Sequence, residues 1–167
     1  YVGSEIRAVL LSKMQVDTRK NICVISGESI AVEAAIMASE GTVVAVEYSA
    51  RDRRTLEDNV SQFGLNNVTI IDHVDEQTMA DLPVPDVTML VASASMEQEM
   101  NCLLKLNPKM EFVIYTLDFA VAAAMSEKCK ALGVGDVEVI QVTVSKLSSK
   151  NTFDTQPAPW IISARPE

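Results

Sequence analysis

The sequence has little of what several classes of protein need. Three cysteines, a single histidine and no Cys-x-x-Cys pair leave too few ligands for a Cys/His zinc site, and we expect no metal. No apolar run approaches the roughly 18 residues of a membrane span. Positive charge is scarce too, since 14 Lys and Arg stand against 23 Asp and Glu, a net charge of −9. Because a duplex-binding protein needs a basic face to neutralise phosphates, nucleic-acid substrates are disfavoured.

The cysteines and the basic residues that are present favour ordinary structural roles. Cys23, Cys102 and Cys129 are odd in number and far apart, which predicts reduced, buried thiols in a cytoplasmic protein. The densest basic group lies within residues 51–54, at the start of a predicted helix. A solvated surface explains this group better than a binding site does.

The first residues predict an amphipathic helix rather than a targeting segment. Ile6, Val9, Leu10 and Met14 recur at helical spacing, without a basic leader region or a cleavage site. Ser4 is the expected N-cap of this helix. The chain does not begin with Met, which suggests a domain excised from a longer protein.

Strand and helix patterns alternate along the chain, which has 48% apolar and 22% charged residues and is long enough for one domain. This alternation predicts an α/β, Rossmann-like domain with a mostly parallel sheet of about seven strands, helices on both faces and an antiparallel C-terminal strand. We expect an N-terminal helix within 1–16, an alternating core over 21–135 and a strand pair over 136–167. The predicted strands are 22–25, 42–46, 67–72, 86–92, 111–116, 137–147 and 159–164, and the predicted helices are 4–16, 30–38, 50–63, 96–106 and 119–132.

Residues 21–49 form the stretch around which this architecture is organised. An apolar strand leads into a turn at 26–29, a helix follows, and a second apolar strand ends on Glu47. Such a unit is the usual place for a nucleotide-like cofactor, although its turn normally has three glycines and this one has only Gly27. Glu47 could accept hydrogen bonds from both ribose hydroxyls; the alternative is a strand-end acid in solvent.

The order of these elements resembles the class I S-adenosylmethionine-dependent methyltransferase fold. Four segments are similar, in order and separation, to the decarboxylating precorrin-6 (carbon-15) methyltransferases of cobalamin biosynthesis: SEIRAVLLSKM, TLEDNVSQFGLNNV, YTLD and PWIISA. They are spread from residue 4 to residue 164, nearly the whole chain, and together they are fairly specific, although none is diagnostic by itself.

The two glycine motifs of that family are altered here. Aligned on Ser29 and Glu33, the family's first aspartate becomes Ile22, and its three glycines become Val24, Ser26 and Glu28. The family's second glycine-rich site, after the fourth strand, is Val91-Ala92-Ser93-Ala94-Ser95 in this chain. Side chains therefore stand where the family has none, in both turns.

The resemblance implies where the ligands would lie. Its candidate cofactor-binding residues are Ser26, Gly27, Ser29, Glu47, Asp75 and Ala92, and its weaker candidates for substrate binding are Ser93, Ser95 and Thr116. Methyl transfer needs alignment of donor and acceptor rather than a dedicated nucleophile, so no catalytic residue is assigned. The resemblance also implies a small, anionic tetrapyrrole as substrate, and a homo-oligomer or a subunit or domain of a larger cobalamin-synthesis protein.

Several residues allow two interpretations. Glu28 could cap its helix or contact a ligand. Asp75 could accept an adenine amine or be an ordinary loop acid, and the only histidine, His73, could be a general base or merely solvated. Lys146, Lys150 and Arg165 could meet the substrate carboxylates or be surface charge. The eight methionines lie mostly on predicted core faces, where we expect them to pack.

Three functions follow from these observations. The first is an S-adenosylmethionine-dependent methyltransferase acting on a corrin precursor. The second is a degenerate methyltransferase-fold domain that binds no cofactor and serves as a structural or subunit-contact module. The third is a methyltransferase that acts on another small molecule or on a protein.

Overall fold

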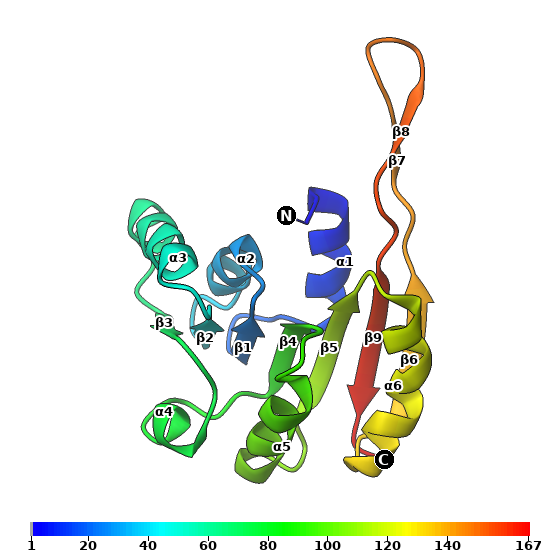
Figure 1. Cartoon of the computed structure of the whole chain (residues 1–167). Coiled ribbons are helices and arrows are strands. Elements are labelled where there is room, and N and C mark those ends of the chain that lie inside the picture. The colour runs from blue at the N-terminus through cyan, green and yellow to red at the C-terminus, as the bar shows by residue number, and fades with distance from the viewer. Residues whose placement is uncertain (1) are drawn as a thin grey trace.

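A computed structural model describes residues 2–167; Tyr1, which the predicted N-terminal segment includes, lies outside the described residues. One seven-stranded sheet lies at the centre, in the order β3-β2-β1-β4-β5-β9-β6 (Figure 1). Its strands are β1 (Asn21–Ile25), β2 (Thr42–Val46), β3 (Val68–Ile71), β4 (Val87–Val91), β5 (Glu111–Thr116), β6 (Asp136–Gln141) and β9 (Trp160–Arg165). The helices are α1 (Ser4–Lys13), α2 (Ser29–Met37), α3 (Ala50–Gln62), α4 (Glu76–Met79), α5 (Met96–Leu106) and α6 (Phe119–Ala131).

The sheet is parallel over five strands and ends in an antiparallel pair. β3, β2, β1, β4 and β5 pair in parallel, and β9 runs antiparallel to both β5 and β6. The predicted fold class is confirmed, including the antiparallel C-terminal strand. Because β9 inserts between β5 and β6, the last strand in the chain is not the edge of the sheet.

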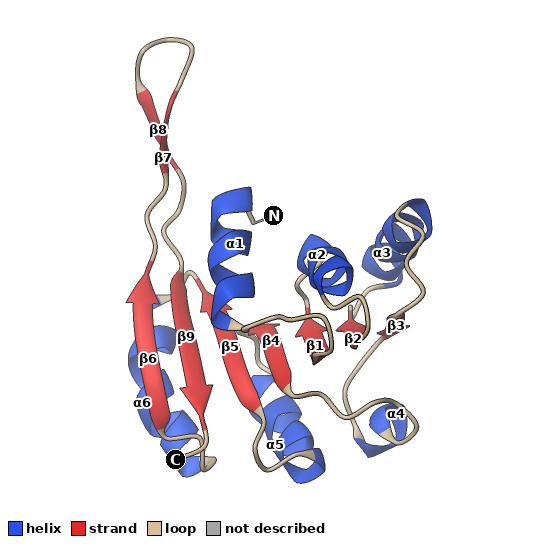
Figure 2. Ribbon diagram, turned by 180° about the vertical axis from the view of Figure 1, so that it is seen from behind, coloured by secondary structure: helices blue, strands red, loops and turns tan. Residues whose placement is uncertain are grey.

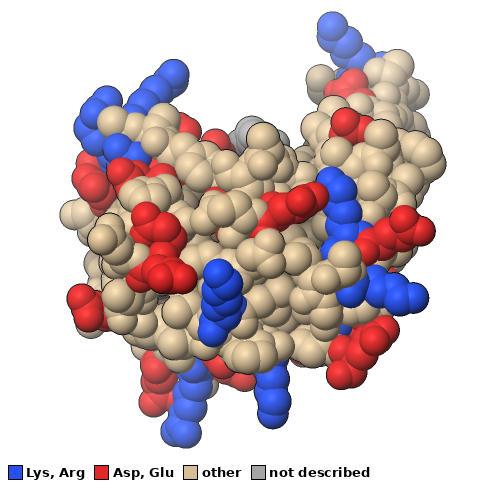
Figure 3. Space-filling model, turned by 60° about the horizontal axis from the view of Figure 1, so that its bottom comes forward, with Lys and Arg blue, Asp and Glu red and all other residues tan. Residues whose placement is uncertain are grey.

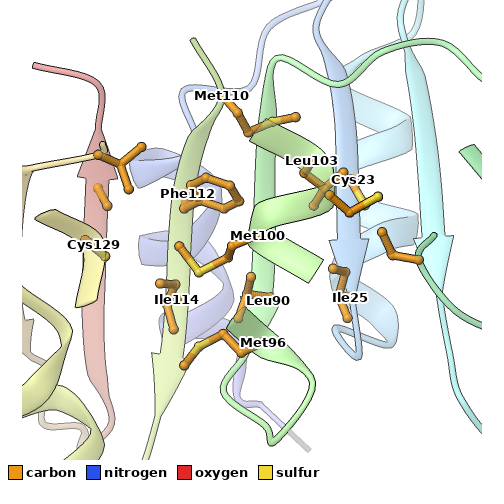
Figure 4. Close-up of a cluster of buried hydrophobic side chains, with 14 of the residues drawn as sticks. Cys23, Ile25, Leu90, Met96, Met100, Leu103, Met110, Phe112, Ile114 and Cys129 are labelled. Atoms are coloured by element: carbon orange, nitrogen blue, oxygen red, sulfur yellow. The ribbon is translucent and has the colours of Figure 1, made fainter. Parts of the chain in front are cut away.

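Helices cover both faces of the sheet, with α1, α2 and α3 on one face and α4, α5 and α6 on the other (Figure 2). Each face has its own hydrophobic cluster, and Figure 4 shows the α5–α6 side, where Met96, Met100 and Phe112 meet. The central strands are buried on both faces, which is why they read as continuous apolar runs rather than as alternating ones.

The expected packing of the sulfur-containing side chains is confirmed. Seven of the eight methionines are buried, whereas Met37 is 43% exposed. Cys23, Cys102 and Cys129 are buried and free. Among the described residues, no group of three His, Cys, Asp or Glu side chains could hold a metal ion, and no helix there is long and apolar enough to cross a membrane.

The prediction of one strand over 137–147 followed by a loop is wrong. β6 ends at Gln141, and a separate hairpin follows, made of β7 (Ser145–Leu147) and β8 (Phe153–Thr155). Pairing with β9 ends at the Gln141–Trp160 register, so the strand beyond it has no neighbour in the main sheet and pairs with the returning chain instead. The resulting arm projects from the edge at which the parallel strands end (Figure 1).

The predicted N-cap of the first helix is also wrong. α1 has Gly3 as its N-cap, with no side-chain capping bond, and the Ser4 hydroxyl donates to Glu5 Oε2 at 3.0 Å instead. The acidic stretch at 73–82 holds the single turn of α4. It begins at Asp75 with a capping box that Thr78 completes.

A close backbone approach positions α2 on the sheet. A Cβ atom added at Gly27 would overlap Cγ1 of Val24 and lie 3.3 Å from Sδ of Met89. Val24 is fully buried and, being β-branched, has one strongly preferred rotamer, so it cannot move aside cheaply. The glycine at position 27 is therefore the one that makes room for the valine at position 24.

This complementarity predicts a strong coupling between the two positions. Gly27→Ala is expected to lower the free energy of unfolding by about 1–3 kcal/mol, because it overpacks the contact with Val24. In a Val24→Ala background the same change should cost at least about 1 kcal/mol less, a coupling measurable by urea unfolding of the four proteins of a double-mutant cycle. Additive effects of the two substitutions would contradict this account.

Candidate active site

The carboxyl ends of β1 and β4 lie side by side where the order of the strands reverses. From β1 the chain continues to β2 and β3 on one side, and from β4 it continues to β5 on the other. In open parallel sheets, ligands bind in the crevice outside the strands at such a switch point. The residues that follow β1, β2 and β4 therefore define the candidate site, which we call the switch-point crevice.

The turn after β1 keeps a glycine-like backbone without glycines at the critical positions. Ser26 has φ of 58°, and Glu28 has φ of 50° with ψ of −118°. These are two of the three positions where the resembled family has glycine. The N–H of Ser26 donates to the carbonyl of Val46 at 2.8 Å, which ties the turn to the end of β2. Two residues with side chains thus adopt backbone conformations that glycine adopts at little cost.

Glu28 lies at the start of its helix. It is the N-cap residue of α2, but its side chain makes no capping hydrogen bond. With Ser29 it lines a pocket between α2 and α3, together with Arg51, Asp52 and Thr55. Of the candidate cofactor residues, Ser29 therefore lines this pocket, whereas Ser26 and Gly27 lie in the turn that ends β1.

Glu47 is buried rather than solvated. Only 3% of the residue is exposed, and its Oε2 accepts a hydrogen bond from the N–H of Glu28 at 3.2 Å. Burial raises the pKa of Glu47 to about 7, with the nearby carboxylates of Asp52 and Glu28 acting in the same direction. Arg53 donates to the backbone carbonyl of Glu47 at 3.0 Å and so fixes the end of β2.

Tyr48 and Glu99 form a hydrogen bond that sequence reasoning missed. The Tyr48 hydroxyl donates to Glu99 Oε2 at 2.6 Å, which joins the end of β2 to α5. Burial and the Glu99 carboxylate raise the pKa of Tyr48 to about 12, while the hydroxyls of Ser93 and Ser26 act against this increase. Tyr48 therefore lies among groups that follow β1, β2 and β4, within the switch-point crevice.

A signal for Glu99 was present in the sequence. Met96, Met100 and Leu103 form the apolar stripe of α5, and Glu99 lies within that stripe rather than on the polar face. An acid on the buried face of an amphipathic helix is unusual, because lone buried carboxylates are costly. Tyr48 has no comparable signal, because an aromatic residue after a strand is ordinary.

The residues expected after β4 and β5 lie at the same edge of the sheet. Ala92 donates from its N–H to the carbonyl of Tyr115 at 2.9 Å, which joins the ends of β4 and β5. Ser93 and Ser95 are exposed, and the Ser93 hydroxyl accepts from the N–H of Ser95 at 3.2 Å. Thr116 is 6% exposed and accepts from the N–H of Asp118 at 3.0 Å. Ser93 and Ser95 thus face solvent beside the crevice, whereas Thr116 stabilises the loop after β5.

The acids after β3 have partners of their own. Asp75 Oδ1 accepts from the N–H of Thr78 at 2.7 Å, and its Oδ2 lies 2.7 Å from Nε2 of His73. Nδ1 of His73 lies 2.6 Å from Asp72, and the two carboxylates raise the pKa of His73. A raised pKa favours the cationic form of His73, which makes this residue a poorer candidate for a general base.

The candidate basic residues do not gather at the crevice. Arg165 ends β9 at the opposite edge of the sheet, where its Nε lies 3.6 Å from Glu111. The face turned forward in Figure 3, which includes that edge, carries both signs of charge interspersed. Lys146 lies on the projecting arm and pairs with Glu5 at 2.5 Å.

Comparisons with known structures define the class of fold. The chain is similar to a precorrin-6y C5,15-methyltransferase from Geobacter metallireducens (23% identity, 100% of this chain and 90% of that chain, TM-score 0.89). It is also similar to a precorrin 8w decarboxylase from Methanobacterium thermoautotrophicum (16%, 98% and 91%, TM-score 0.82) and to a SAM-dependent O-methyltransferase from Thermotoga maritima (15%, 100% and 67%, TM-score 0.75). The fold is thus that of the class I methyltransferases.

The family follows from the sequence model. The model of the precorrin methyltransferase domain matches residues 3–159, and the chain therefore belongs to that family. The family and the methyltransferase interpretation predicted from the four segments are confirmed. No curated protein sequence matches the chain.

The strained turn predicts that glycine at position 28 stabilises the protein. Glu28→Gly should be more stable than Glu28→Ala by about 1–2 kcal/mol, because only glycine adopts φ of 50° with ψ of −118° without a Cβ clash. Both variants remove the carboxylate, so their difference, measured by urea unfolding, isolates the backbone effect. Equal stabilities would show that the turn relaxes without cost.

Burial of Glu47 predicts that stability falls as the pH rises. The native state holds the Glu47 proton up to about pH 7, whereas the unfolded state releases it near 4.5. Between these values the native state binds more protons, so the free energy of unfolding should decrease by up to about 3 kcal/mol from pH 5 to pH 8.

Urea unfolding at several pH values tests this slope. Glu47→Gln should flatten it and be more stable than the wild type at pH 8. Glu57→Gln, on the exposed surface of α3, is the matched control and should leave the slope unchanged. A wild-type slope retained in Glu47→Gln would assign the effect to another group.

Proposed function

We propose that this chain is an S-adenosylmethionine-dependent methyltransferase acting on a precorrin-type tetrapyrrole. Family membership supports the reaction class. The observation that carries the proposal for this chain is the turn after β1, where Ser26 and Glu28 keep a glycine-like backbone although they are not glycine. A backbone held in this strained path where a cofactor would approach is typical of a functional site.

The residues at the switch-point crevice fit a nucleoside cofactor, provided that Tyr48 moves. Ser26 and Gly27 would lie beside the amino-acid portion, and Ala92 beside the base. The Oε2 atom of Glu47 accepts a hydrogen bond from a backbone N–H in the free protein. Once the crevice opens, the Glu47 carboxylate would also accept hydrogen bonds from the ribose hydroxyls. When bound, S-adenosylmethionine supplies an activated methyl group, so the protein has only to align this group with the substrate and exclude water.

Exposed apolar side chains after β5 support a macrocyclic substrate. Phe119 is 66% exposed and Leu117 is 55% exposed, and both follow the end of β5. The Phe119 ring lies 5.5 Å from that of Trp160, at an interplanar angle of 57°. Exposed aromatic and apolar side chains of this kind can pack against the face of a tetrapyrrole ring. Lys146 and Lys150, on the arm that projects from the same edge, are the proposed partners of its carboxylates, and Lys146 would exchange Glu5 for a substrate carboxylate.

We infer from the same family that the chain works as a homo-oligomer or as part of a larger cobalamin-synthesis protein. The arm carries Leu147 and Phe153, which are 60% and 69% exposed. Exposed apolar side chains on a projecting hairpin favour contact with another surface. The free, buried cysteines favour a reducing, cytoplasmic environment.

A second candidate function is a domain of this fold that binds no cofactor. Two observations favour it: Glu47 is only 3% exposed, and the Tyr48–Glu99 bond crosses the crevice. Both would have to change before a ribose could reach the Glu47 carboxylate.

Calorimetric titration with S-adenosylhomocysteine separates the two candidates. Binding with Kd below about 1 mM, equivalent to about −4 kcal/mol, is expected from the first. Glu47→Ala should then weaken binding at least about tenfold, because a hydrogen bond to a charged group contributes about 1.5–3 kcal/mol. Glu57→Ala is the control and should bind as the wild type does.

Absence of binding at 1 mM would establish the second candidate. If binding occurs, methyl transfer from labelled S-adenosylmethionine to a precorrin, but not to nucleosides or peptides, identifies the substrate class. Transfer to peptides alone would contradict the tetrapyrrole assignment.

A further inference from the structure

Glu99 has acceptor capacity that the fold does not use. Only 2% of the residue is exposed, and its Oε2 accepts from the Tyr48 hydroxyl at 2.6 Å. Its other oxygen, Oε1, is buried and has no hydrogen-bond partner among residues 2–167. Buried polar atoms are nearly always paired, so an unpaired carboxylate oxygen calls for a donor from outside these residues, and a bound ligand would supply one.

This carboxylate is reached from the switch-point crevice. Tyr48 directly follows Glu47 at the end of β2, and its hydroxyl crosses to α5, which follows β4. β1 lies between β2 and β4 in the sheet, so the tyrosine side chain passes over the end of β1. The hydroxyl that touches Glu99 therefore occupies space that a ligand in the crevice would need.

Asp75, the acid that the sequence predicts will meet a base, has a partner on each of its carboxylate oxygens. Its Oδ1 caps α4, and its Oδ2 lies 2.7 Å from His73. Gln98, the neighbour of Glu99, donates to the carbonyl of Val74 at 3.1 Å, which ties α5 to the loop of Asp75. α5 and the loop of Asp75 thus lie side by side, and of the two acids Glu99 is the one with an unpaired oxygen.

We propose that Glu99, rather than Asp75, accepts the exocyclic N–H of a purine base bound in the crevice, and that the Tyr48 hydroxyl holds this position in the free protein. The inference rests on the proposed cofactor-binding function and deepens it. When the ligand binds, the Tyr48 side chain moves away, the Tyr48–Glu99 bond opens, and the base amine donates to the Glu99 carboxylate, whose Oε1 is unpaired in the free protein. Glu99 is therefore a specificity-determining residue, and Tyr48 competes with the ligand.

Two nucleosides that differ only in this amine test the proposal. Adenosine carries the exocyclic amine, and purine riboside lacks it. By calorimetry, the wild type should bind adenosine at least tenfold more tightly than purine riboside. Glu99→Leu should reduce this preference to less than threefold. Leucine suits the apolar stripe of Met96, Met100 and Leu103, so this variant is expected to fold.

Asp75→Asn is the matched control, because asparagine also caps a helix and leaves the rest of the site intact. It should keep the full preference for adenosine. Tyr48→Phe retains the ring but removes the competing hydroxyl, and it should bind adenosine at least threefold more tightly than the wild type. Unchanged or weaker binding of adenosine by Tyr48→Phe would show that the Tyr48 hydroxyl does not compete with the ligand for Glu99.

The outcomes separate this inference from the proposed function. No adenosine preference in the wild type, a preference that persists in Glu99→Leu, or one that Asp75→Asn also removes overturns the assignment of Glu99. If S-adenosylhomocysteine still binds in any of these cases, the proposed function is not contradicted. If the wild type binds neither S-adenosylhomocysteine nor adenosine at 1 mM, both proposals are overturned.

Discussion

The contact between Gly27 and Val24 determines how the candidate site is built. Because a side chain at position 27 would overlap Val24, the glycine lets α2 approach β1 closely. The chain then has to turn within three residues, which places Ser26 and Glu28 at positive φ. The N–H of Glu28 consequently points to Glu47, so one close approach fixes both the turn and the acid at the end of β2.

The altered glycine motif is therefore a rearrangement as much as a loss. Where the resembled family has glycine at position 24, this chain has a buried valine, and the space that valine needs comes from Gly27. The backbone at positions 26 and 28 keeps the path that glycines would allow, at a cost in strain. Retention of a costly conformation is easier to understand if the turn still meets a ligand than if it only connects a strand to a helix.

Two buried carboxylates give the crevice its chemical character. Glu47 and Glu99 come from different elements, and burial raises the pKa of each. Among residues 2–167 each accepts a hydrogen bond from one donor: a backbone N–H for Glu47 and the Tyr48 hydroxyl for Glu99. A ligand rich in hydroxyl and N–H donors would supply further hydrogen bonds to both carboxylates. This is the complementarity expected for a nucleoside.

Local patterns in the sequence determined the order of strands and helices, the family and the position of Glu47, because burial periodicity and strand ends are properties of neighbouring residues. The same patterns failed for the β7–β8 arm, whose pairing depends on where β9 stops. Only the tertiary structure decided that Glu47 is buried, that Asp75 is already engaged and that Tyr48 reaches Glu99 across 51 positions of the chain. These facts depend on contacts between distant segments, and no local spacing encodes which hydroxyl will meet which carboxylate.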